Sequence, residues 1–82
     1  MIGIILTLEG LQQFSDNITS ETTLWVNPAI ADNASQFAFQ QAPAAIRVLP
    51  QTYPADKEKS VLAALDYVES QTDDPDVFIE YP

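Results

Sequence analysis

The sequence predicts an α+β fold, a small two-layer domain in which a mostly antiparallel sheet of about five strands carries two helices on one face. Three observations lead to this prediction. The length of 82 residues suits one domain and leaves no room for a second. The apolar content of 46% is that of a globular protein rather than a disordered one. Apolar residues follow strand or helix spacing in an order of strand, helix, three strands, helix and strand.

The first third of the chain predicts a strand, a helix and a second strand. Residues 2–7 are apolar and rich in β-branched side chains, as in a buried strand. Residues 8–18 repeat apolar side chains at three-to-four spacing, and Thr7 can cap the resulting helix. Residues 22–27 have the composition of a strand, which ends at Asn27 and Pro28, and residues 29–34 are expected to form a loop.

The middle of the chain predicts a β-hairpin. Residues 36–40 alternate polar and apolar side chains, as a half-buried strand does. A turn at Pro43 then leads into residues 45–49, which would run back beside the first strand. This hairpin is the main reason to expect an antiparallel sheet.

The last third predicts a helix and a final strand. Pro54 fits the first turn of a helix, because its missing N–H costs nothing there. The helix carries an apolar stripe and ends at residues 72–75, and residues 76–82 form the strand. The apolar side chains that define the stripe and one face of the strand are Val61, Leu62, Leu65 and Val68, followed by Val77, Ile79 and Tyr81.

Cysteine and histidine are both absent from the sequence. Their absence excludes disulfides, thiolate nucleophiles, zinc knuckles and a Ser-His-Asp relay within one chain. We therefore expect no enzymatic activity, no cofactor and no metal site. The acidic segment at residues 73–76 concentrates oxygen ligands, but it lacks the glycine turn and ligand spacing of a calcium loop.

The strongest compositional signal is the acidity of the chain. Twelve Asp and Glu residues face three Lys and Arg residues, for a net charge of −9. This sign disfavours direct binding to nucleic acid or to an anionic membrane and favours a basic partner. The excess of acidic residues lies after Lys59. The predicted helix therefore has Lys57 near its start and acids near its end, and both placements oppose the helix dipole. The acids after Lys59 are Asp66, Glu69, Asp73, Asp74, Asp76 and Glu80.

Two interpretations of these acids are compatible with the sequence, and the second has a sharper form. They could form a solvated face that keeps a small protein soluble. They could form a docking edge for a basic protein surface. In a sharper form of the second interpretation, Asp74, Asp76 and Glu80 on one strand would be spaced by multiples of about 6.6–6.8 Å, close to two nucleotide rises, and would mimic a nucleic acid.

Aromatic residues supply the remaining candidates for partner binding. Trp25 is a binding anchor if its face of the strand is exposed, and a core residue if a helix covers it. Tyr67 lies on the helix away from the predicted apolar stripe and close to Asp66, so it is the better surface candidate. Arg47, between apolar residues on a strand, is assigned a structural role, either solvated or paired with a neighbouring carboxylate.

The N-terminal apolar run has no basic region before it, is too short to cross a bilayer and is followed by Glu9. We therefore expect a cytoplasmic protein without membrane contact.

The functional prediction is a non-enzymatic protein-binding module, an inhibitor or adaptor that docks a negative surface on a basic partner. One concrete version is an inhibitor that occupies a nucleic-acid site, as some phage-encoded anti-defence proteins do. The alternative is a structural or assembly subunit that forms a homo-oligomer through its sheet edges or Trp25. The predicted partner-binding residues are Asp66, Glu69, Asp73, Asp74, Asp76, Glu80, Trp25 and Tyr67.

Overall fold

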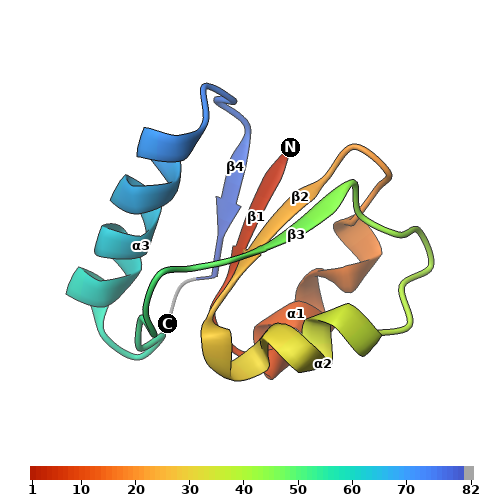
Figure 1. Ribbon diagram of the computed structural model, residues 1–82, viewed down its shortest axis with the longest axis horizontal. Coiled ribbons are helices and arrows are strands. Elements are labelled where there is room, and N and C mark those ends of the chain that lie inside the picture. Colours follow the sequence, from red (N-terminus) through yellow and green to blue (C-terminus); the bar gives the residue numbers. More distant parts are fainter. Residues whose placement is uncertain (81–82) are drawn as a thin grey trace.

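The computed structural model describes residues 1–80 and shows three layers, with a parallel sheet between two layers of helices (Figure 1). The sheet has the strand order β3-β2-β1-β4, and every neighbouring pair is parallel. The helices α1 and α2 cover one face and α3 covers the other (Figure 1). In chain order, the elements are β1 (Ile2–Ile5), α1 (Leu8–Phe14), η1 (Ser15–Asn17), β2 (Thr23–Val26), η2 (Pro28–Ile30), α2 (Ala31–Gln36), β3 (Ala45–Val48), α3 (Glu58–Gln71) and β4 (Val77–Ile79).

The predicted α+β fold, a two-layer domain with a mostly antiparallel sheet and both helices on one face, is therefore wrong. Each connection between consecutive strands contains a helix that returns the chain to the same end of the sheet, and such connections produce parallel neighbours. Three of the predicted strand segments nevertheless contain strands in full, at residues 2–7, 22–27 and 45–49. What was wrong was how the chain travels between them.

The predicted hairpin fails at its first strand. Residues 29–34, expected to be a loop, contain most of η2 and most of α2, and residues 37–44 form neither helix nor strand. The alternation at Phe37 and Phe39 has another cause. Both rings pack against the core under α1 and α2 and against each other, with their centroids 4.9 Å apart. Two aromatic side chains that are two residues apart and pack on the same core give the same sequence pattern as a strand.

The core between the sheet and α1 depends on a close approach of α1 to β1. A Cβ atom at Gly3 would lie 2.6 Å from the Phe14 ring, so only glycine leaves room for this packing. Phe14 also stacks on Phe78 of β4, with ring centroids 4.3 Å apart. Phe78 is 42% exposed, so α1 leaves this edge of the sheet partly open.

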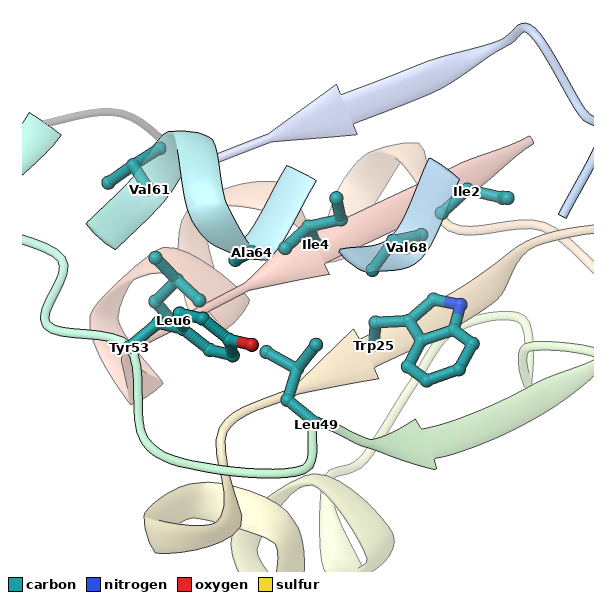
Figure 2. Close-up of a cluster of buried hydrophobic side chains, with 9 residues drawn as sticks. All are labelled: Ile2, Ile4, Leu6, Trp25, Leu49, Tyr53, Val61, Ala64 and Val68. Carbon is teal, nitrogen blue, oxygen red and sulfur yellow. The ribbon is translucent and has the colours of Figure 1, made fainter. Parts of the chain in front are cut away.

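The second core lies between the sheet and α3, as Figure 2 shows. The predicted stripe of α3 is confirmed in its main part, since Val61 and Val68 are fully buried, whereas Leu62 is 43% exposed. The helix begins at Glu58, after Pro54, so the proline lies in the preceding loop. The buried residues of this cluster are Ile2, Ile4, Leu6, Trp25, Leu49, Tyr53, Val61, Ala64 and Val68.

The predicted final strand is shorter than expected. β4 comprises Val77–Ile79 and pairs with β1, so the segment is confirmed as a strand at its centre. Tyr81, which was expected on its inner face, lies outside the described residues. Among the helices of residues 1–80, none is both long and apolar enough to span a bilayer.

Candidate functional site

A crevice lies at the carboxyl ends of β1 and β4, where this topology favours a ligand site. The chain leaves β1 towards β2 and β3 and later returns to place β4 on the other side of β1. In doubly wound α/β sheets, ligands bind outside the carboxyl ends of the strands at such a reversal. A crevice of about 310 Å³ lies here, lined by Thr7, Glu9, Gly10, Gln13, Ala55, Asp56 and Glu80.

The carboxylate of Glu80 occupies the hydrogen-bond donors of this crevice. Its Oε1 atom accepts hydrogen bonds from the backbone N–H groups of Leu6, at 2.8 Å, and of Thr7, at 3.0 Å. Its Oε2 atom accepts from the Thr7 hydroxyl at 2.6 Å. That hydroxyl in turn accepts from the N–H of Gly10 at 3.0 Å, so the predicted capping of α1 by Thr7 is confirmed. A side chain of the protein thus binds where an anionic ligand would.

Gly10 is required for this arrangement. A Cβ atom at position 10 would overlap the Glu80 carboxylate. Glu9 and Asp56 add two more acids to the walls of the crevice. Because its donors are used and its lining is acidic, the crevice is unsuited to a phosphate or a nucleotide.

Asn27 closes the same end of the sheet between β2 and the loop before α3. The side chain is buried at 3% exposure, and its Nδ2 atom donates to the backbone oxygens of Leu6, at 3.0 Å, and Tyr53, at 2.8 Å. Its Oδ1 atom accepts from the N–H of Tyr53 at 2.9 Å. A buried amide with its hydrogen bonds made is a structural brace, because losing it would strand several polar groups.

The acids on the outer side of α3 have no such internal role. Asp66 and Glu69 are exposed, and Asp73 follows in the loop after the helix. Their side chains make no hydrogen bond or ion pair within the part of the chain that the structure describes. Leu62, one turn before Asp66, adds an exposed apolar side chain on the side of α3 that carries these acids. We call Asp66, Glu69 and Asp73 the acidic face of α3.

Asp74 differs from its neighbours because it has internal partners. Its carboxylate lies 3.0 Å from the ammonium group of Met1 and accepts the backbone N–H of Asp76 at 2.9 Å. The hydrogen bond from Asp76, and then the one from the ammonium group, hold the pKa of Asp74 below its ordinary value. Asp74 therefore ties the loop after α3 to the start of β1.

The nucleotide-like spacing expected for the C-terminal acids does not occur. β4 includes only Val77–Ile79, so Asp74 and Asp76 lie in the loop before it. Glu80 follows the strand but binds the start of α1. The regular spacing required all three acids on one strand.

Trp25 and Tyr67 pack against each other. Trp25 is 7% exposed in the core under α3, which is the second of the two alternatives that the sequence left open. Its ring meets Tyr67 edge to face, with centroids 5.7 Å apart and an interplanar angle of 80°. Tyr67 is partly buried against this core.

Sequence reasoning missed the structural role of Glu80. Thr7 and Gly10 have the spacing of a capping residue and the backbone N–H that it accepts, so that half of the interaction was visible. The other half comes from 73 residues further along the chain, and it depends on β4 pairing with β1 in parallel. An antiparallel sheet would have placed Glu80 elsewhere.

Residues 1–80 contain no group of acidic, cysteine or histidine side chains arranged to hold a metal ion. Comparison with known proteins adds no assignment: the sequence matches no family model and no curated protein, and the fold matches no solved structure.

Proposed function

We propose that the protein is a non-enzymatic binding module that docks the acidic face of α3 on a basic surface of a protein partner. The observation that carries this proposal is the contrast among the acids after Lys59. Glu80 and Asp74 are engaged inside the protein, whereas Asp66, Glu69 and Asp73 project from one helix and its following loop without internal partners in residues 1–80.

The position of these acids supports a role other than stability. Glu69 lies in the last turn of α3, which contains no basic residue. Carboxylates near a helix C-terminus oppose its dipole, and each such interaction is worth roughly 0.3–1 kcal/mol. Sequence features that reduce stability without an evident compensating interaction are expected at functional or strained sites.

The composition of the acidic face also fits a docking surface. Leu62 contributes an exposed apolar side chain next to the acids, and interfaces combine such contacts with charged rims. Charge complementarity would accelerate association and make it sensitive to salt. An inhibitor that covers a nucleic-acid site is one form of this proposal, with charge rather than strand spacing as its basis.

The test compares two triple variants in a pull-down from the native host. The variant Asp66→Asn/Glu69→Gln/Asp73→Asn removes the acidic face. The control Asp16→Asn/Glu21→Gln/Asp32→Asn makes the same change in net charge at exposed positions outside α3 and its following loop. We expect a basic protein that the wild type and the control retain at low salt and that the first variant loses. Equal capture by all three proteins would refute the proposal.

The alternative function, an assembly subunit, rests on the edge strand β3, where Val48 is 50% exposed. Buried Trp25 is not available as its contact. Light scattering over a range of concentrations distinguishes the two functions. A constant monomer mass would eliminate the assembly function. A stable oligomer that also forms in the variant without the acidic face would favour it.

A further inference from the structure

A second hollow lies at the opposite end of the sheet from the Glu80 crevice. It has a volume of about 390 Å³ and lies between β3 and the C-terminal end of α3. β3 is an edge strand, and α3 is the only described helix on this face of the sheet (Figure 1). We call it the amino-end pocket, and its size is within the range of small-molecule sites.

The pocket lies beside a buried hydrogen-bond donor that has no acceptor among residues 1–80. Trp25 lines it, and the Nε1 atom is buried and has no hydrogen-bond partner among residues 1–80. Figure 2 shows the indole nitrogen on the edge of the ring that points towards Ile2 and Val68, beside the end of α3. Buried polar groups are nearly always paired in folded proteins, so an unpaired indole N–H calls for an acceptor from outside residues 1–80.

The lining also includes an exposed cation, Arg47, that has no ion-pair partner among residues 1–80. Arg47 stands opposite Trp25 in the register of β2 and β3, so both side chains project from the same face of the sheet. Its guanidinium group forms no ion pair within the described part of this acidic chain. Asp74 is the one carboxylate in the lining, and it is held by Met1 and Asp76 instead.

We propose that the amino-end pocket binds a small organic carboxylate. One carboxylate oxygen accepts the Trp25 N–H, and the negative charge lies against Arg47, whose planar group matches a carboxylate. Thr23 and Thr72 supply hydroxyl groups for other polar atoms of the ligand. A single unpaired cation fits a monoanion better than a phosphate dianion. This site is independent of the proposed function, since the acidic face of α3 shares no residue with it.

The rival explanation for the indole N–H is the neighbouring Tyr67 ring. The two rings meet at 80°, and an N–H can donate weakly to an aromatic face. A proton held over a ring resonates upfield, and the change Tyr67→Leu would move it. The experiment therefore includes this variant.

The test uses the indole signal of the single tryptophan in a ¹H–¹⁵N correlation spectrum. The wild type is titrated with sodium acetate at constant ionic strength, with acetamide as the uncharged match. We expect a saturable downfield shift of the indole proton with acetate and none with acetamide. Arg47→Gln should weaken acetate binding about tenfold or more, because it removes the charge-assisted hydrogen bonds. The control Lys59→Gln, with the same charge change outside the pocket, should bind acetate as the wild type does.

Three results would overturn the proposal. One is the absence of a saturable shift with acetate. Another is an equal response to acetate in Arg47→Gln. The third is an indole proton whose signal is upfield in the free protein, moves downfield in Tyr67→Leu and does not shift with acetate. None of these results bears on the acidic face, which the two triple variants test separately.

Discussion

Glu80 and the acidic face of α3 belong to the same acidic part of the sequence, after Lys59. Their side chains nevertheless have different roles in the structure. The Glu80 carboxylate accepts three hydrogen bonds at the carboxyl end of the sheet. Asp66, Glu69 and Asp73 make none inside the described chain. The difference teaches that net charge alone does not identify a binding surface. Only the acids without internal partners are free to meet another molecule.

The largest expected effect separates these two kinds of acid by stability. Glu80→Ala should lower the free energy of unfolding by about 2–4 kcal/mol, because two backbone N–H groups and the Thr7 hydroxyl lose a charged acceptor. The matched change Glu69→Ala should alter it by less than about 0.5 kcal/mol. Urea denaturation measures both. Equal effects at the two positions would remove the distinction.

The next effect isolates the contact between Glu80 and Gly10. Gly10→Ala should cost about 1–3 kcal/mol in the wild type, since the added Cβ atom overlaps the carboxylate. In the Glu80→Ala background the same change should be neutral or stabilising by up to about 1 kcal/mol, because alanine is the better helix former. A double-mutant cycle by urea denaturation checks this change of sign. Additive effects would show that the two residues do not meet.

A smaller effect concerns the acidic face itself. Glu69→Gln should raise the free energy of unfolding by about 0.3–0.5 kcal/mol, because it removes a negative charge from the last turn of α3. Asp32→Asn, in the first turn of α2, should shift stability slightly the other way. Thermal denaturation at low salt measures both changes. A loss of stability in Glu69→Gln would mean that this acid has a structural role after all.

The smallest effect concerns Asp74, which has internal partners although it lies next to Asp73. Its pKa is lowered in the folded protein, so its contribution to stability is present above the unfolded pKa and is lost as the pH falls through the folded pKa. A carboxyl NMR titration should therefore give Asp74 a midpoint below that of a free aspartate in an unstructured peptide. Asp76→Pro removes the first of its donors, the N–H, and should raise the midpoint. An unchanged midpoint would argue against that hydrogen bond.

The limits of sequence reasoning follow from the range of the interactions concerned. Local patterns located α1, α3 and the four strands, because capping by Thr7 and the stripe through Val61 are local properties. The direction of β3 relative to β2 depends on whether residues 28–44 contain a helix, and the aromatic pair at Phe37 and Phe39 gave the pattern of a strand instead.

The candidate site, like the fold, was predictable only in its local features. The excess of acid after Lys59 was visible in the sequence, and the exposure of Asp66 and Glu69 follows from the helical spacing. Which acids are used internally was not visible. Glu80 depends on the parallel pairing of β4 with β1, and Asp74 depends on the position of Met1 beside the loop. The alternatives for Trp25 could be separated only once α3 was placed over the sheet.

The most direct test of the central claim is the salt dependence of association with the purified partner. Association rates are measured over a range of ionic strength for the wild type, the variant Asp66→Asn/Glu69→Gln/Asp73→Asn and the control Asp16→Asn/Glu21→Gln/Asp32→Asn. If the acidic face of α3 docks the partner, the wild type and the control will share fast rates that fall with salt. The first variant will associate slowly with a flat salt dependence. The same salt dependence in all three proteins would contradict the account.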